Sequence, residues 1–295
     1  MASIFKGSGV ALVTPMKENG EINYDALDQL IEAQIAGGTD ALIVCGTSGE
    51  APTLDDDEHL EAIRFAIERT KGRIPVIAGT GSNNTAHAVM MTQECEKFGA
   101  DGVLLVTPYY NKATQEGLYQ HYRTIAGSTS LPCIVYNVPS RTGTNILPET
   151  MARLARDQAN IAAIKEASGN ISQVEKVCAL TEGRLDVYSG NDDQIVPICA
   201  VGGIGVISVL AHVAPRQTHD MVMYCLEGDY GKARALQHKA LPLVEQLFIE
   251  VNPIPVKAAL NMQGFAVGAP RLPLTEMTRE HQATLRQAME AFGCL

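Results

Sequence analysis

The chain has 295 residues, of which 46% are hydrophobic and 19% are charged, and its formal net charge is −10 at pH 7. This composition is typical of a globular protein and excludes a disordered chain. The negative charge and the lack of Lys/Arg clusters exclude a nucleic-acid surface and favour small metabolites as partners. No apolar run approaches the roughly 20 residues of a membrane span, so we expect no membrane contact. The N-terminus lacks the pattern of a secretory signal, and we expect a cytoplasmic protein.

The cysteines are scattered singly along the chain. There are 7 of them, with no CxxC pair and no histidine at metal-ligand spacing. This pattern predicts reduced thiols in the core, with neither a disulfide nor a metal site.

Short apolar runs alternate with amphipathic stretches through most of the chain. Their spacing of about 25 to 35 residues predicts strand-helix units rather than hairpins. The runs are apolar on both faces, as expected for parallel strands that are covered on both sides. The predicted strands are 9–15, 40–46, 74–81, 101–108, 131–139, 161–168, 185–191 and 203–209.

The stretches between the strands have a helical period and recognisable starts. Asp55 with Glu58 forms a capping box, and Ser172 with Glu175 is a second candidate. The predicted helices are 24–36, 55–70, 85–98, 115–126, 148–156, 171–180 and a short one from 192.

Eight strand-helix units favour an α/β fold, an eight-stranded parallel (β/α)8 TIM barrel. The main competitor is an open doubly wound sheet, which would carry a glycine-rich GxGxxG turn after its first strand. Here the GSG at Gly7 to Gly9 precedes the predicted strand instead of following it. The sequence therefore favours the closed barrel.

Beyond residue 209 the pattern is helical only. The predicted helices there are 215–227, 229–250, 255–262 and 275–292. We predict a barrel domain at 1–228 and a C-terminal α-helical extension at 229–295, packed against the barrel because no flexible linker separates them.

One lysine lies inside a predicted strand. Lys165 occupies the apolar segment IAAIKEAS, where burial penalises the ammonium and lowers its pKa towards that of a nucleophile. Two interpretations are open at this segment. Lys165 is either a structural lysine paired with a carboxylate such as Glu166, or a reactive amine.

The active site of such a barrel lies at the carboxyl ends of its strands. After the second strand, the GTSGE turn offers the hydroxyls of Thr47 and Ser48 and exposed amides that could bind a carboxylate, although it could be only a tight turn. Tyr136 ends the strand beside that of Lys165, which brings a phenol near an amine. Arg141 is either a bidentate carboxylate anchor or an ordinary loop arginine.

These residue types together predict Schiff-base chemistry on a keto acid. A neutral amine attacks the ketone, and the iminium then makes the neighbouring methyl group acidic. A phenol can carry the protons if neighbouring hydroxyls, such as those of Thr47 and Tyr110, relay them. The scheme requires no metal and no cofactor, and it favours the reactive amine at Lys165.

Five motifs resemble the pyruvate-dependent lyase and synthase family, whose members form a Schiff base. The resemblance runs from about residue 7 to the C-terminus, in order and at family spacing. The motifs are GTSGE at 46–50, VTPYYNK at 106–112, YNVPSRTG at 136–143, IKEAS at 164–168 and SGNDD at 189–193.

The resemblance implies a reaction and its partners. It is strongest to the branch that condenses pyruvate with L-aspartate 4-semialdehyde, the first committed step of diaminopimelate and lysine synthesis. The arginine of YNVPSRTG separates this branch from the sialic acid lyases. The family is usually a homotetramer built as a dimer of dimers.

The resemblance also implies a role for each residue that matches a family motif. Lys165 would form the Schiff base, and Tyr136 would be the general acid and base. Thr47 and Tyr110 would complete the proton relay, with Tyr110 reaching into the site of a neighbouring subunit.

The same comparison implies four substrate-binding residues. Ser48 stands where most of the family has a second threonine, and its hydroxyl and amide would still bind the pyruvate carboxylate. Ile207 would contact pyruvate through its backbone, and Gly190 would line the pocket. Arg141 would bind the carboxylate of the semialdehyde.

A second, allosteric site for L-lysine is implied by three matches: His59, Asn83 and Tyr109. The chain departs from the family nearby, however: Ala51-Pro52 replaces the usual small polar pair, and Asp56 stands where histidine is frequent. His87 stands where a glutamate that would pair with the ammonium of lysine is frequent. This departure predicts weak or absent feedback inhibition.

Two other functions remain open from sequence. One is a related pyruvate-dependent aldolase acting on another aldehyde, of the N-acetylneuraminate type or a phosphorylated sugar acid. The glycine-rich turn at 202–205 could hold a phosphate, although no nearby Lys or Arg supplies a countercharge. The other is a keto-acid sensor without catalysis.

Overall fold

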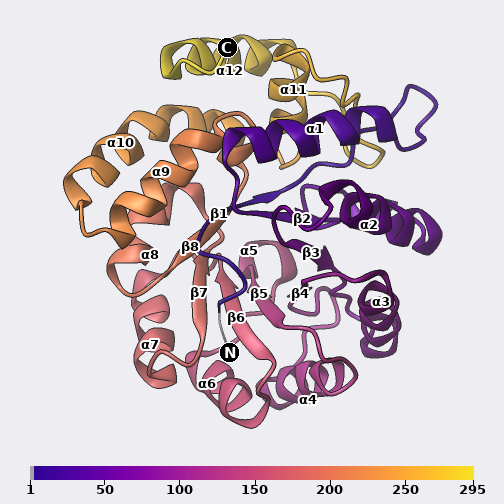
Figure 1. Ribbon diagram of the computed structural model, residues 1–295, viewed down its shortest axis with the longest axis vertical. Helices are drawn as coiled ribbons and strands as arrows, with labels where there is room; N and C mark the ends of the chain where they lie inside the picture. The colour runs from indigo at the N-terminus through magenta and orange to yellow at the C-terminus, as the bar shows by residue number, and fades with distance from the viewer. Residues whose placement is uncertain (1–2) are drawn as a thin grey trace.

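The computed structural model describes residues 3–295 and has the closed parallel barrel that the sequence predicts (Figure 1). Each strand pairs in parallel with the next, and the last strand pairs back with the first. All eight predicted strands are confirmed, each shorter than predicted. They are β1 (Gly7–Ala11), β2 (Ala41–Val44), β3 (Val76–Gly79), β4 (Gly102–Val106), β5 (Cys133–Asn137), β6 (Ile161–Glu166), β7 (Asp186–Ser189) and β8 (Gly205–Ser208).

The GSG segment at 7–9 lies inside β1, so its predicted place before the strand was wrong. A Cβ atom on Gly9 would lie 2.7 Å from Ile43 Cδ1 and 2.9 Å from Phe5 Cζ. Only glycine therefore fits at this position of β1, beside Ile43 and Phe5. There the Phe5 ring stacks on Tyr188 with centroids 4.3 Å apart.

Helices surround the barrel and cover the outer faces of its strands (Figure 1). Single-turn 3-10 helices η1 (Ala51–Thr53), η2 (Asp192–Gln194) and η3 (Leu210–His212) follow β2, β7 and β8, and the unpredicted short α5 (Pro139–Thr142) follows β5. The main helices of the barrel are α1 (Tyr24–Gly37), α2 (Asp56–Thr70), α3 (Thr85–Phe98), α4 (Gln115–Ala126), α6 (Pro148–Asp157), α7 (Ile171–Thr181), α8 (Ile195–Ala200) and α9 (Pro215–Leu226).

Helix starts follow the sequence signals in most places. The capping box of Asp55 and Glu58 is present at α2. At α7, however, the N-cap is Asn170 and not Ser172, because the Asn170 side chain accepts a hydrogen bond from the backbone N–H of Gln173. Asparagine caps a helix at least as well as serine, and the earlier cap sets the start.

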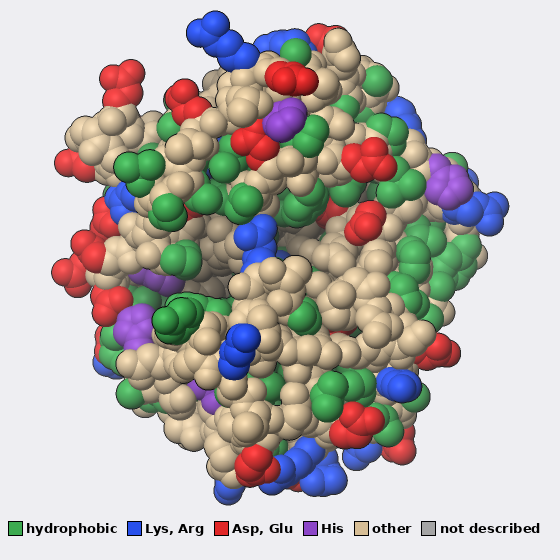
Figure 2. Space-filling model, turned by 180° about the vertical axis from the view of Figure 1, so that it is seen from behind, with side chains coloured by type: hydrophobic (Ala, Val, Ile, Leu, Met, Phe, Trp, Pro, Cys, Tyr) green, Lys and Arg blue, Asp and Glu red, His purple; other side chains and the backbone are tan. Residues whose placement is uncertain are grey.

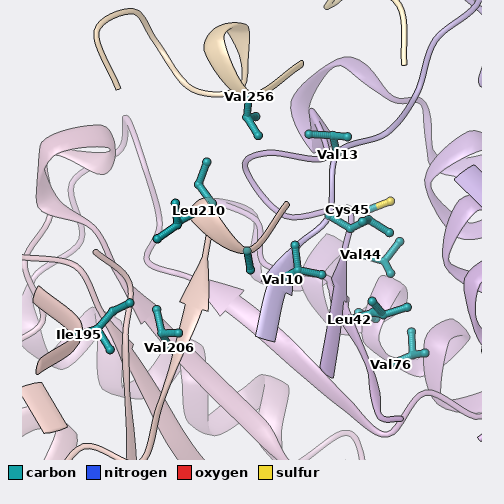
Figure 3. Close-up of a cluster of buried hydrophobic side chains, with 14 of the residues drawn as sticks. Val10, Val13, Leu42, Val44, Cys45, Val76, Ile195, Val206, Leu210 and Val256 are labelled. Carbon is teal, nitrogen blue, oxygen red and sulfur yellow. The ribbon is translucent and has the colours of Figure 1, made fainter. Parts of the chain in front are cut away.

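Three further helices lie together on one side of the barrel (Figure 1): α10 (Tyr230–Leu247), α11 (Ile254–Met262) and α12 (Arg279–Phe292). Val256 of α11 lies over Val13 and Leu210 in the same buried apolar cluster (Figure 3). Because these side chains share one core, α11 is held against the barrel by apolar burial. Within residues 3–295, none of the helices combines the length and apolar character that a membrane-spanning helix requires.

Candidate active site

Lys165 lies inside the barrel beside a phenol. In the strand register, Lys165 of β6 is opposite Tyr136 of β5 and Tyr188 of β7. Residues opposite one another on neighbouring strands project to the same face of a sheet. The Lys165 Nζ atom accordingly lies 4.2 Å from the centroid of the Tyr136 ring, and the Lys165 residue is only 5% exposed.

Burial makes the Lys165 amine unusually easy to deprotonate. Its pKa is lowered to about 7: desolvation is the largest cause, the Asp192 carboxylate acts in the opposite direction, and the Arg141 guanidinium adds a smaller lowering. An amine with this pKa is about half neutral at pH 7 and mostly neutral at slightly alkaline pH, and the neutral amine is the nucleophilic form.

Glu166 is not the partner of Lys165. Successive residues of a strand face opposite sides, so Glu166 points away from the barrel interior. Its carboxylate accepts hydrogen bonds from Asn137 Nδ2 at 3.1 and 3.2 Å, from Gln173 Nε2 at 3.2 Å and from the Ser168 backbone N–H at 2.7 Å. The interpretation of Lys165 as one half of a pair with Glu166 was therefore wrong.

Tyr136 is buried, and Arg141 and Thr47, two other residues singled out from the sequence, both change the pKa of its phenol. Burial raises the pKa of the Tyr136 phenol, whereas the nearby Arg141 guanidinium and a hydrogen bond with Thr47 lower it. The loop after β2 and the short helix α5 thus bring Thr47 and Arg141 to the same phenol. A phenol whose proton is shared with a hydroxyl is suited to proton transfer.

Gly190 and Ile207 lie at the wall of the same space. A Cβ atom on Gly190 would lie 3.2 Å from Lys165 Cε and 2.7 Å from Ala167 Cβ, so only glycine leaves the lysine its place. Ile207 of β8 belongs to the same inner cluster as Tyr136. Both sequence-predicted residues therefore face the interior around Lys165.

Ser48 is buried in the loop after β2. Its Oγ accepts a hydrogen bond from Asn252 Nδ2 at 2.9 Å. Two residues further on, the Glu50 carboxylate forms an ion pair with Lys257 at 2.6 Å. The loop after β2, which carries Thr47 and Ser48, is thus attached to the C-terminal part of the chain. The sequence did not indicate this attachment.

Tyr110 does not reach this site within one chain. It is 91% exposed, and its φ of 72° lies in the left-handed region. The expected relay of three hydroxyls is therefore assembled only in part, by Thr47 and Tyr136.

The three residues matched to an allosteric site have different environments. The Asn83 side chain donates to the Tyr109 carbonyl at 3.2 Å, which ties the loops after β3 and β4 together. His59 is buried on α2 with its Nε2 2.8 Å from the Gly79 carbonyl. Nearby, His87 Nε2 lies 2.9 Å from Asp56 Oδ1, so these two residues pair with one another.

Asp192 is a residue of the site that sequence reasoning passed over. It is buried at the end of β7, and its carboxylate accepts hydrogen bonds from Ser208 Oγ at 2.5 Å and from the N–H groups of Val209 and Leu210 at 2.9 and 2.8 Å. Burial raises its pKa. The sequence signal that could have identified Asp192 is its position in the SGNDD motif, at the end of the strand next to that of Lys165. Among residues 3–295, no group of three His, Cys, Asp or Glu side chains is arranged to hold a metal ion.

The space-filling view shows a hollow near the middle of one face of the molecule, with Lys or Arg side chains at its margin (Figure 2). The fold and the buried amine define a class of protein. It is a (β/α)8 barrel in which a buried, readily deprotonated lysine beside a phenol can attack a carbonyl compound.

Sequence comparison narrows the class to a family. The chain belongs to the dihydrodipicolinate synthetase family, whose model matches residues 4–292. It is 58% identical to the 4-hydroxy-tetrahydrodipicolinate synthase of Caldicellulosiruptor bescii over 291 residues, which are 99% of this chain and 98% of that protein. The resemblance inferred from the five motifs is thereby confirmed.

Solved structures give the same result. The dihydrodipicolinate synthase of Thermotoga maritima is 45% identical, with a TM-score of 0.97 over 99% of this chain and 100% of that one. The corresponding enzyme of Cyanidioschyzon merolae, solved with lysine bound, is 41% identical, with a TM-score of 0.97 over 99% of this chain and 100% of that one.

The pKa of Lys165 can be measured by competitive labelling with trace acetic anhydride. We expect acetylation of Lys165 to be half-maximal near pH 7, because burial lowers its pKa to about 7. The exposed Lys176 in the same digest is the internal standard. Asp192→Asn should move the midpoint for Lys165 to lower pH, because the lost carboxylate no longer stabilises the ammonium. A midpoint near the ordinary lysine pKa of about 10.4 would contradict the environment described here.

Proposed function

We propose that this protein is a lyase that condenses pyruvate with L-aspartate 4-semialdehyde to give 4-hydroxy-tetrahydrodipicolinate, the first committed step of diaminopimelate and lysine synthesis. The observation that carries the proposal is the Lys165 amine, buried, with a pKa of about 7 and 4.2 Å from the Tyr136 ring. The names of the relatives, 4-hydroxy-tetrahydrodipicolinate synthase, support the choice of reaction.

The reaction follows from the chemistry of a neutral amine. Lys165 Nζ adds to the ketone carbon of pyruvate, and loss of water gives an iminium. Loss of a methyl proton then gives an enamine, whose carbon attacks the aldehyde of the semialdehyde. The amino group of the semialdehyde finally attacks the iminium carbon, closes the ring and releases Lys165. No step consumes a metal ion or a cofactor.

Tyr136 is the general acid and base of these proton transfers. Its phenol lies next to the amine and shares a hydrogen bond with Thr47. Tyr110 of a neighbouring subunit completes the relay, which agrees with its exposure of 91% in a single chain. The active unit is then at least a dimer, within a homotetramer built as a dimer of dimers.

The substrate carboxylates bind at two places. Ser48 and the backbone of the loop after β2 hold the carboxylate of pyruvate, with Gly190 and the backbone of Ile207 at the opposite wall. Arg141, on α5, holds the carboxylate of the semialdehyde. Its guanidinium is close enough to lower the pKa values of both Lys165 and Tyr136.

Two further features belong to the proposal. The chain divides into a barrel at 1–228 and a helical extension at 229–295, supported by the end of α9 at Leu226 and the start of α10 at Tyr230. The enzyme acts in the cytoplasm, where a small-molecule biosynthetic step of this kind finds both substrates.

Borohydride trapping tests the Schiff base. With pyruvate and sodium borohydride, we expect Lys165 to gain the mass of pyruvic acid less one oxygen atom, because reduction fixes the iminium. Mass spectrometry of the digest locates the adduct, and Lys165→Arg should abolish it. An unmodified Lys165 would refute the mechanism.

An aldehyde panel separates this function from its alternatives. L-aspartate 4-semialdehyde should react with the unreduced pyruvate Schiff base and so lower the yield of adduct when it is added before borohydride, whereas N-acetylmannosamine and glyceraldehyde should not. Turnover with one of the latter would favour a related aldolase, and adduct formation without turnover of any aldehyde would favour a sensor.

Arg141→Ala tests the second carboxylate site. Loss of a charge-assisted bidentate contact costs about 1.5 to 3 kcal/mol, so we expect the KM for the semialdehyde to rise by roughly 10- to 150-fold. Arg141→Lys is the matched control, because it keeps the charge near Lys165 but loses the planar fork. A semialdehyde KM that is unchanged in both variants would remove the proposed role.

L-lysine should inhibit this protein weakly or not at all. His87 pairs with Asp56 at 2.9 Å, so the position that would offer a carboxylate to the lysine ammonium offers an imidazole. Steady-state rates with increasing L-lysine measure the effect, and His87→Glu should strengthen inhibition. Inhibition of the unaltered enzyme at low-millimolar lysine or below would contradict the expectation.

A further inference from the structure

A buried ion pair connects the loop after β2 to α11. Lys257 Nζ lies 2.6 Å from Glu50 Oε1, and both side chains are 1% exposed. Lys257 also donates to the Ala269 carbonyl at 3.0 Å, and the second oxygen of Glu50 accepts from the Arg271 backbone N–H at 2.8 Å. Both charges are therefore desolvated and enclosed by partners, which makes the pair sensitive to loss of either member.

A second contact joins the same two parts of the chain. Asn252 Nδ2 donates to Ser48 Oγ at 2.9 Å, and both residues are buried. Ser48 lies two residues before Glu50, and Asn252 lies just before the start of α11. The segment that carries Thr47 and Ser48 is thus attached to the C-terminal helices at two points.

The loop after β2 has a conformation that its own residues disfavour. Cys45 has a φ of 55° and Glu50 a φ of 56°, both in the left-handed region that side chains with a Cβ rarely adopt. Such backbone persists only where its surroundings over-determine it. Here the surroundings include the ion pair at the end of the loop, the Asn252 contact in its middle and a hydrogen bond from Thr14 Oγ1 to the Gly49 carbonyl.

The position of α11 is itself fixed by apolar packing. Val256, next to Lys257, lies over Val13 and Leu210 in the shared core (Figure 3). The helix therefore presents the Lys257 amine at a defined place. Apolar packing thus fixes α11, and the Lys257 amine on α11 in turn fixes Glu50 in the loop that carries Thr47 and Ser48.

We propose that Glu50 and Lys257 are a positioning pair that sets the hydroxyls and amides of Thr47 and Ser48 for the pyruvate carboxylate. The inference rests on the function proposed above and deepens it. Neither residue touches the reacting atoms, so neither is catalytic. Their effect is on the affinity for the keto acid.

The test is the pyruvate concentration that gives half-maximal borohydride trapping on Lys165. For Lys257→Met and for Glu50→Gln we expect this concentration to rise by about tenfold or more, equivalent to about 1.4 kcal/mol of binding. The maximal extent of trapping at saturating pyruvate should be unchanged. Lys232→Met, which removes a lysine from an exposed ion pair on α10, should leave the concentration unchanged.

A double variant separates positioning from stability. Each single variant leaves a buried charge without its partner, whereas Glu50→Gln with Lys257→Met leaves none, so its melting temperature should recover towards that of the unaltered protein. Its trapping concentration should remain raised, because the loop has still lost its ionic tie. Recovery of both quantities together would mean that the pair acts only on stability and would overturn the proposal.

The outcomes for the two proposals are distinguishable. If the unaltered protein forms no adduct with pyruvate, the proposed function fails. If it forms the adduct and the folded variants trap pyruvate at the same concentration, the function stands and the positioning role falls. Circular dichroism of each variant establishes that it is folded.

Discussion

The constraint on which the site depends is the removal of one amine from water without a carboxylate in direct contact. An isolated ammonium in the interior of a protein is costly, and the cost is relieved by releasing a proton. The barrel supplies the burial, and Gly190 supplies the space beside the lysine side chain. Asp192 limits the shift, since its carboxylate is close enough to raise the pKa that burial lowers. The low pKa of the amine therefore depends on several neighbouring strands and not on the segment around Lys165 alone.

The two buried lysines show how environment divides one residue type into two roles. Lys165 faces a phenol and has a pKa of about 7. Lys257 faces a carboxylate at 2.6 Å and has a further backbone acceptor at 3.0 Å. Burial lowers the pKa of both, but Glu50 acts against that shift at Lys257 through charge and a hydrogen bond. The Lys257 amine is held by direct contact with a carboxylate, whereas the Lys165 amine has no such contact and remains available to react.

The sequence predicted the barrel, its strand count and the residues around Lys165, because a lysine in an apolar run and polar residues at strand ends are local signals. It did not predict contacts between distant segments. Nothing near Lys257 indicates that its partner is Glu50, although the apolar setting of PIPVKAAL was as unusual as that of Lys165. The sequence also failed to predict where some helices and strands begin, because two possible starting points were close in energy. Asn170 and Ser172 are both good helix caps, and GSG is compatible with either a turn or a strand.

Glu50 lies 207 residues before Lys257 in the chain. A ribosome adds about 5 to 20 residues per second, so this interval corresponds to about 10 to 40 s of synthesis. During that time the six strands β3 to β8 are made, but the segment that bears Thr47 and Ser48 still lacks its ionic partner. The ion pair with Lys257 is therefore one of the last contacts that the growing polypeptide can form, because α11 follows every strand of the barrel.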